Sequence, residues 1–330
     1  MRTLDRFALV FAVAAFGIGL ATPVAAENIA VSNYGVAANA MPYAVALEKK
    51  FYQQQGANVT GIISSQGGGT SIRNMLAGGV AYAEANPGAT AVAIQQGADL
   101  KIISDNVLTV AEFVWAVKPD SPIKSIKDFK GKKIGYTNPR STSQALALLL
   151  LQAAGLKPED AELVRTGGFG EGVAALDIGA IDVAPMAEPV WSKFKGKYRA
   201  VVAASDVLPP LDNVVGVTTS AAAASRADFI KAVIRARRQA VEFMNANPDE
   251  AGDIVAKHYN IDKEVARSAV RSLTASRTHG IPYWGTGQFH LDGMKRMMDV
   301  QKMVGAISGD FDLAKMIDTS FLPEDIRTPK

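Results

Sequence analysis

The fold of this chain is decided by two β-type runs, Ala111-Glu112-Phe113-Val114-Trp115-Ala116-Val117 and Asn213-Val214-Val215-Gly216-Val217-Thr218-Thr219. Both are rich in residues that favour extended backbone. The first run leads to Pro119 and Pro122, which fix a turn before a new series of elements starts. The second introduces a C-terminal third that is predicted to be almost wholly helical. We therefore expect the two runs to be paired crossings between two lobes, with a ligand cleft between the lobes.

Short strands alternate with amphipathic helices on both sides of the first run, which predicts an α/β fold built from βαβ units. We assign residues 27–115 and 216–330 to a discontinuous first lobe, and residues 116–215 to a second lobe. The expected strands are 28–32, 59–64, 80–85, 100–104, 132–136, 163–165 and 181–184, and the expected helices are 41–55, 70–77, 88–96, 141–154, 171–177, 226–246, 248–258, 263–273 and 291–303.

The N-terminal residues have the order of a secretory signal peptide. Arg2 and Arg6 precede an apolar run over residues 7–20, and small residues follow as far as Ala26. The apolar run is shorter than the roughly 20 residues that span a bilayer. We expect cleavage between Ala26 and Glu27, and a soluble mature protein outside the cytoplasm.

Composition excludes several functions. The 330 residues include no cysteine, so thiol nucleophiles and cysteine-ligated metals are excluded. The 35 Lys and Arg residues nearly balance the 32 Asp and Glu residues, which argues against nucleic acid or anionic lipid as partners. The three histidines lack metal-ligand spacing, and neither a phosphate loop nor a Gly-x-Ser-x-Gly elbow occurs. We expect a monomer that is not an enzyme and needs no cofactor or metal.

Two segments are candidates for holding an anion. Gly67-Gly68-Gly69-Thr70-Ser71 and Arg140-Ser141-Thr142-Ser143 each place hydroxyls and a helix N-terminus after a predicted strand. Arg140 could also form a bidentate contact with a carboxylate or sulfonate. The alternatives are that the hydroxyls only cap their own helices and that Arg140 is a solvated loop residue. The candidates are Gly68, Gly69, Thr70, Arg140, Ser141, Thr142 and Ser143.

Other candidates follow the carboxyl ends of predicted strands, where α/β sheets place ligands. Tyr34 and Phe169 could enclose a planar or aliphatic body, and Glu188 could bind a ligand ammonium or only tie down its loop. Met41 and Trp284 are weaker candidates, because such residues usually belong to the core. The candidates in this group are Asn33, Tyr34, Met41, Asn86, Phe169 and Glu188.

The mature chain resembles a known family along essentially its whole length: the periplasmic solute-binding proteins of ABC importers for nitrate, sulfonates, taurine and related compounds, which include thiamine-pyrimidine-precursor binders. The resemblance is carried by residues 46–56, 67–71, 122–134, 141–143, 155–156, 175–184 and 188–189.

This resemblance implies a type II periplasmic-binding fold, two lobes joined by a two-strand hinge. It also implies capture of a small anionic organic solute for an inner-membrane permease and its ATPase. Sulfonate, carboxylate, nitrate and pyrimidine precursor all remain open as ligands, and a ligand-sensing subunit is an alternative role. Thiamine-pyrimidine synthases of this fold use a cysteine-rich motif, which this chain lacks.

Overall fold

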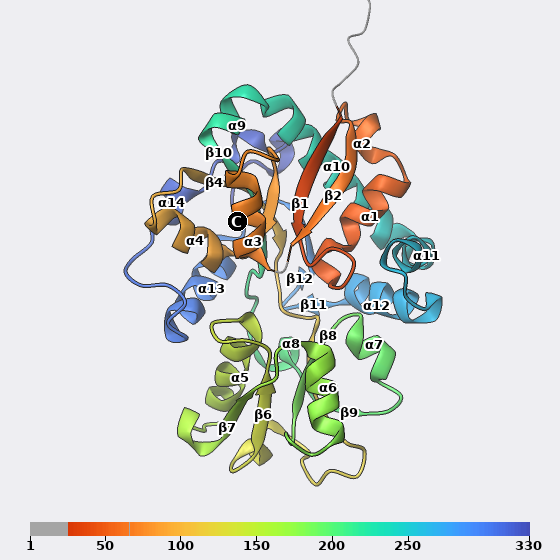
Figure 1. Ribbon diagram of the computed structural model, residues 1–330, viewed down its shortest axis with the longest axis vertical. Coiled ribbons are helices and arrows are strands. Elements are labelled where there is room, and N and C mark those ends of the chain that lie inside the picture. Colours follow the sequence, from red (N-terminus) through yellow and green to blue (C-terminus); the bar gives the residue numbers. More distant parts are fainter. Residues whose placement is uncertain (1–25, 66) are drawn as a thin grey trace, which may run out of the picture.

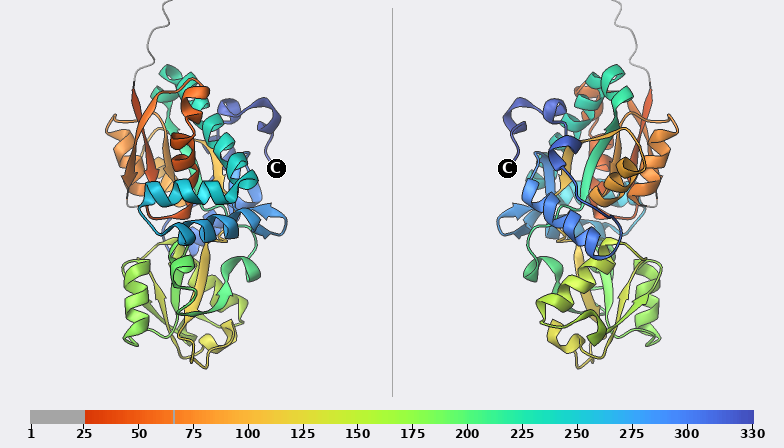
Figure 2. Two further views of the ribbon diagram at one scale, coloured as in Figure 1. Left: turned by 90° about the vertical axis from the view of Figure 1, so that its right-hand side faces the viewer. Right: turned by 90° about the vertical axis from the view of Figure 1, so that its left-hand side faces the viewer.

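A computed structural model describes residues 26–65 and 67–330, and the predicted signal peptide lies almost wholly outside them. The chain forms two lobes, one above the other in Figure 1. It begins in the larger lobe, passes through the smaller lobe in its middle third, and returns to the larger lobe (Figures 1 and 2). This arrangement confirms the prediction of two α/β lobes.

The larger lobe is built on a six-stranded sheet with the order β13-β4-β10-β3-β1-β2. Strand β1 pairs in parallel with β2 and β3, whereas β10 lies antiparallel between β3 and β4. The returning chain therefore completes a sheet that the first hundred residues leave in two parts. The strands are β1 (Glu27–Ser32), β2 (Val59–Ser65), β3 (Ala83–Ala85), β4 (Leu100–Val107), β10 (Val214–Thr219) and β13 (Trp284–Gly287).

Helices cover this sheet. Helix α3 packs on β1 and β3, whereas α10 packs on α1, α2 and β13. A short hairpin, β11 (Arg277–Thr278) and β12 (Ile281–Pro282), follows α12. The helices are α1 (Met41–Glu48), α2 (Phe51–Gln54), α3 (Gly68–Leu76), α4 (Pro87–Gln95), α9 (Ser220–Ser225), α10 (Ala227–Ala246), α11 (Pro248–Tyr259), α12 (Lys263–Ala275), α13 (Leu291–Met303) and α14 (Leu313–Met316), with short 3₁₀ turns at Ala38–Ala40, Thr319–Phe321 and Glu324–Ile326.

The smaller lobe contains an antiparallel sheet with the order β8-β5-β9 and a parallel pair, β6 and β7. A bridge between Ile134 and Val183 joins the two groups of strands. The strands are β5 (Phe113–Val117), β6 (Lys133–Tyr136), β7 (Glu162–Arg165), β8 (Ala184–Ala187) and β9 (Arg199–Ala203). The helices are α5 (Thr142–Ala153), α6 (Phe169–Asp177), α7 (Val190–Phe194) and α8 (Ala204–Val207), with 3₁₀ turns at Ile126–Phe129 and Pro158–Asp160.

The chain crosses between the lobes twice, and each crossing leads into the strand, β5 or β10, that one of the two β-type runs forms. Strand β5 pairs with β8 and β9 in the smaller lobe, and β10 pairs with β3 and β4 in the larger lobe. The crossings themselves are residues 108–112 and 208–213, and Asn213 Nδ2 donates to Glu112 Oε1 across them at 2.8 Å. We therefore propose to divide the lobes near residues 112 and 213, a few residues before the divisions that the sequence suggested.

Helix α13 contributes to the hydrophobic cores of both lobes. Met294 and Met298 pack in the core of the larger lobe, whereas Met297 and Val300 pack with the core of the smaller lobe. From the sequence, we assigned this helix to the first lobe alone. Within the described residues, no helix combines the length and the apolar character that a membrane crossing needs.

Candidate ligand-binding site

Helix α3 begins at the edge of the sheet because glycine allows a close approach there. Gly67 precedes the helix with a φ of 82°, a conformation that favours glycine. A Cβ atom on Gly68 would lie 2.7 Å from the backbone nitrogen of Asn86 and 3.0 Å from Ala85 Cα. The first turn of α3 is thus pressed against the start of α4.

Helix α4 begins beside α3 and is capped by a predicted site residue. Asn86 Oδ1 accepts a hydrogen bond from the Ala89 backbone N–H at 2.6 Å, and Pro87 occupies the first helical position. Asn86 is only partly buried. Its side chain therefore fixes the helix start and still borders the space in front of it.

Helix α5 provides the corresponding start in the smaller lobe. Arg140 has a φ of 63°, and its backbone N–H donates to Gln144 Oε1 at 2.7 Å. Ser141 Oγ caps the helix by accepting from the Gln144 backbone N–H at 3.2 Å. The guanidinium of Arg140 remains exposed in front of this turn.

Thr142 and Ser143 are engaged within the protein. Thr142 Oγ1 donates to Asn213 Oδ1 at 3.1 Å, which links α5 to the second crossing. Ser143 is buried, and its hydroxyl accepts from the Thr137 backbone N–H at 3.0 Å. Alanine at both positions would remove internal hydrogen bonds.

A cavity of about 920 Å³ lies between the starts of these helices. Gly69 and Asn86 line it from the larger lobe, and Pro139 and Arg140 line it from the smaller lobe. The structure thus brings together three of the predicted residues, Gly69, Asn86 and Arg140. The remaining lining residues are Ile72, Arg73, Leu76, Gly88, Ala89, Val92, Ala93, Gln96, Gly97, Ala98, Gln301 and Ala306.

Arg73 and Gln301 are polar residues of this cavity that the sequence analysis missed. Arg73 Nη2 donates to Thr70 Oγ1 at 2.7 Å, so the guanidinium is directed back toward the start of α3. Its position three residues after Thr70 was a usable signal, because residues at that spacing share a helix face. Gln301 lies in α13, more than two hundred residues after Arg73 in the chain, and no local sequence pattern could have indicated it.

Asn33 and Tyr34 lie at the end of β1 and are held by other parts of the larger lobe. The Asn33 backbone N–H donates to Ser65 O at 2.7 Å. The Tyr34 hydroxyl is 3.1 Å from His258 Nδ1, and its ring meets Tyr259 edge-on at a centroid distance of 5.7 Å. Burial raises the pKa of Tyr34 to about 12. The Tyr34 side chain therefore packs against α11.

Three further candidates make contacts within their own lobes, and of these Met41 and Glu188 are buried and Phe169 is partly buried. Met41 is fully buried in the larger core and has no surface for a ligand. Phe169 packs edge-on against Phe113 in the smaller lobe at 5.9 Å. Glu188 is buried and accepts from both the backbone N–H and the hydroxyl of Ser192 at 3.1 Å, and burial raises the pKa of its carboxyl. This geometry favours its role of tying down the loop.

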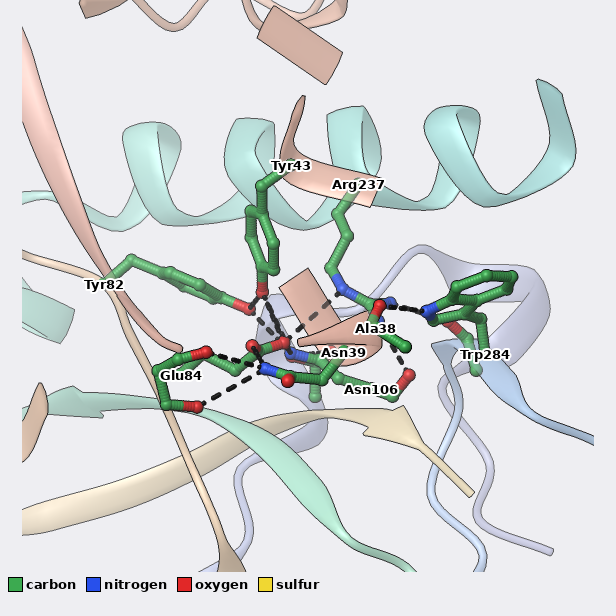
Figure 3. A network of polar contacts seen from close by, with 11 residues as sticks. Ala38, Asn39, Tyr43, Tyr82, Glu84, Asn106, Arg237 and Trp284 are labelled. Atoms are coloured by element: carbon green, nitrogen blue, oxygen red, sulfur yellow. Dashed lines mark hydrogen bonds and ion pairs between the residues drawn. The ribbon is translucent and has the colours of Figure 1, made fainter. Parts of the chain in front are cut away.

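A buried polar network joins several elements of the larger lobe (Figure 3). Asn39, Tyr43 and Asn106 all donate hydrogen bonds to the Glu84 carboxyl, at 2.7 to 3.2 Å. Burial raises the pKa of Glu84 to about 7, although the nearby Arg237 opposes this shift. The network joins α1, β3, β4 and α10. It therefore acts as a polar core.

No cluster of three or more His, Asp and Glu side chains suited to a metal ion occurs within the described part of the chain. The two lobes, the double crossing and the cavity lined from both lobes place this chain in the class of two-lobed α/β proteins with an interlobe cavity. The chain belongs to the NMT1/THI5-like family, whose model matches residues 37–251, more than half of its length.

A curated relative and two solved structures are also similar to this chain. The riboflavin-binding protein RibY of Chloroflexus aurantiacus is 25% identical over 306 residues, which cover 86% of this chain and 82% of RibY. The periplasmic aliphatic sulphonate binding protein SsuA of Escherichia coli has a TM-score of 0.74 and 17% identity, over 88% of this chain and 91% of that one. The periplasmic nitrate-binding protein NrtA of Synechocystis PCC 6803 has a TM-score of 0.69 and 16% identity, over 92% and 87%. The predicted periplasmic-binding fold is confirmed.

Proposed function

We propose that this protein is the periplasmic solute-binding subunit of an ABC importer and that it captures a small organic anion. The observation that carries the proposal is the cavity that Gly69 and Asn86 border from one lobe and Arg140 from the other. A solute that contacts both lobes stabilises the closed arrangement over an open one. The closed form is then presented to the inner-membrane permease.

Charge supports an anion as the solute. Among the described residues that line the cavity, there are arginines but no Asp or Glu. A guanidinium can hold a carboxylate or a sulfonate through two parallel hydrogen bonds. The starts of α3 and α4 add the partial positive charge of helix N-termini. The cavity is also larger than nitrate needs.

The proposal also includes where the protein acts and which proteins it works with. The signal peptide expected over residues 1–26 would send the protein to the periplasm, where it would act as a monomer and perform no bond chemistry. RibY, SsuA and NrtA, which are similar to this chain, are each described as a binding protein. The permease and its ATPase are inferred partners, in keeping with the role that the family resemblance implies.

A thermal-shift screen tests the proposal. Sulfonates, aromatic carboxylates, nitrate, pyrimidines and riboflavin would each be added to the mature protein. A solute at 100 times its dissociation constant adds about 2.7 kcal/mol to the free energy of unfolding. We expect an organic anion to stabilise the protein, and Arg140→Gln to weaken that effect.

Arg277→Gln is the matched control, because Arg277 does not line the cavity and donates only to nearby backbone carbonyls. Stabilisation by riboflavin or a neutral pyrimidine alone, with no response to any organic anion, would contradict the proposal.

A further inference from the structure

The cavity extends away from Arg140 along a groove between α3 and α4. Ile72 and Leu76 line it from α3, at a spacing of four residues, and Ala89, Val92 and Ala93 line it from α4. These spacings place each set on one face of its helix. The groove is therefore walled by two short apolar faces, with Asn86 and Arg140 at its interlobe end and Gln96 at the end of α4.

Arg73 lies where the apolar groove meets the helix starts. Its guanidinium is held toward Gly69 by the hydrogen bond to Thr70, and a Cβ atom on Gly69 would lie 3.7 Å from Arg73 Nη1. Arg73 and Arg140 thus line one cavity from opposite lobes, with no acidic residue among the described residues that line it. An anionic group entering between them would offset two positive charges.

Helix α13 closes the far side of the groove. Gln301 is buried, and a Cβ atom on Gly88 would lie only 2.9 Å from Gln301 Cγ. The glycine therefore lets α4 approach α13 closely enough for Gln301 to form part of the wall. A cavity of about 920 Å³ lies in the range of roughly 300–1,000 Å³ that suits an organic ligand with a sizeable body.

We propose that the solute is an acid with an extended apolar body, and that Arg73 is its specificity-determining residue. Arg73 and Arg140 hold the anionic group, and the apolar body lies in the groove between α3 and α4. This inference rests on the proposed function and narrows it, because it excludes inorganic anions and short zwitterions as preferred solutes.

Calorimetry with a homologous series tests the groove. The probes are propane-, hexane- and nonanesulfonate, the corresponding alkanoates, and hexanol as an uncharged control. Each fully buried methylene should tighten binding by about fourfold, and a partly buried methylene should tighten it by less. We expect affinity to rise with chain length within the series, hexanol not to bind, and the comparison of sulfonates with alkanoates to identify the head group.

Variants of the protein then test the binding of the anionic head group and of the apolar body separately. Arg73→Gln should weaken hexanesulfonate or hexanoate by about tenfold or more, because a charged hydrogen bond is lost. Ala93→Phe should fill the groove, so it should weaken the binding of the hexyl probes by a larger factor than the binding of propanesulfonate. An unchanged circular dichroism spectrum checks that this variant is folded. Arg277→Gln should match the wild type.

The outcomes distinguish the two proposals. The groove assignment is overturned if affinity does not rise with chain length, or if Arg73→Gln and Ala93→Phe bind the hexyl probes normally. The broader proposal survives that result if Arg140→Gln still weakens propanesulfonate. If the wild type binds no sulfonate or alkanoate in the series, the groove assignment fails, and the thermal-shift screen decides the broader proposal separately.

Discussion

Glu112 is the residue whose chemistry depends most on its position between the lobes. It lies in the first crossing, is almost fully buried, and accepts a hydrogen bond from Asn213 in the second crossing. Burial raises the pKa of its carboxyl from 4.5 to about 8, and the hydrogen bond from Asn213 only partly opposes this shift. The crossings are therefore joined through a carboxyl group that prefers to be neutral.

This pKa predicts a loss of stability as pH rises. Between pH 4.5 and about 8 the folded protein keeps a proton on Glu112 that the unfolded chain releases. The free energy of unfolding should therefore fall through this range, by up to about 1.4 kcal/mol per pH unit. Glu112→Gln should remove this part of the decline, because glutamine resembles the protonated acid and can still accept from Asn213. Urea unfolding at several pH values measures it.

A parallel Glu84→Gln variant serves as the comparison, because the pKa of Glu84 is also raised, to about 7. The contribution of Glu84 to the fall in the free energy of unfolding should end near pH 7, whereas the contribution of Glu112 continues to about pH 8. An unchanged pH slope in Glu112→Gln would show that this carboxyl is ionised in the folded protein.

At the scale of elements, two adjacent glycines at the start of α3 have different roles. A Cβ atom on Gly68 would collide with the backbone of Ala85 and Asn86, whereas one on Gly69 would meet only Arg73, at 3.7 Å. The position of α3 against α4 therefore depends on Gly68. Both glycines belong to the segment that the sequence analysis selected for ligand binding, yet only Gly69 lines the cavity.

We expect Gly68→Ala to lower the free energy of unfolding by about 1–3 kcal/mol, because overpacking forces the backbone to shift. Gly69→Ala should change it by less than about 1 kcal/mol, since a helical alanine costs little where there is space. Chemical denaturation of the two variants gives the comparison. Equal destabilisation by both would mean that α3 is not held by close contact with β3 and α4.

At the scale of the whole molecule, Asn213 links the two crossings to helix α5. Its side chain donates to Glu112 and accepts from Thr142 at the start of α5. Its backbone N–H also donates to Val107 O at the end of β4. Contacts from both lobes and from the first crossing thus meet at this residue.

Asn213→Ala should lower the free energy of unfolding by about 1–3 kcal/mol, because Glu112 and Thr142 both lose a partner. It should also speed amide hydrogen exchange in residues 108–112 and 208–213, as measured by mass spectrometry. Asn138→Ala is the control, since Asn138 is an exposed residue that bonds within the smaller lobe. Exchange at the crossings that matches the control would show that this junction does not hold the lobes.

Much of the fold and part of the site could be predicted, because the relevant signals are local. The starts of α4 and α5 are set by Asn86 and Ser141, whose side chains cap backbone groups three residues away. By contrast, Thr142, Ser143 and Glu188 have side chains of the right type for a ligand but partners inside the protein. Such partners depend on packing, which local chemistry does not encode.

The sequence by itself determined the α/β alternation, the helix starts and the two-lobed fold, because hydrophobic period and capping act over a few neighbouring residues. Only the tertiary structure placed β10 between β3 and β4, turned Tyr34 toward α11, and brought Arg73, Arg140 and Gln301 to one cavity. The residues in these contacts lie 67 to 228 positions apart in the chain. The contacts form only when the larger lobe has folded and, for Arg140, when the two lobes have packed together.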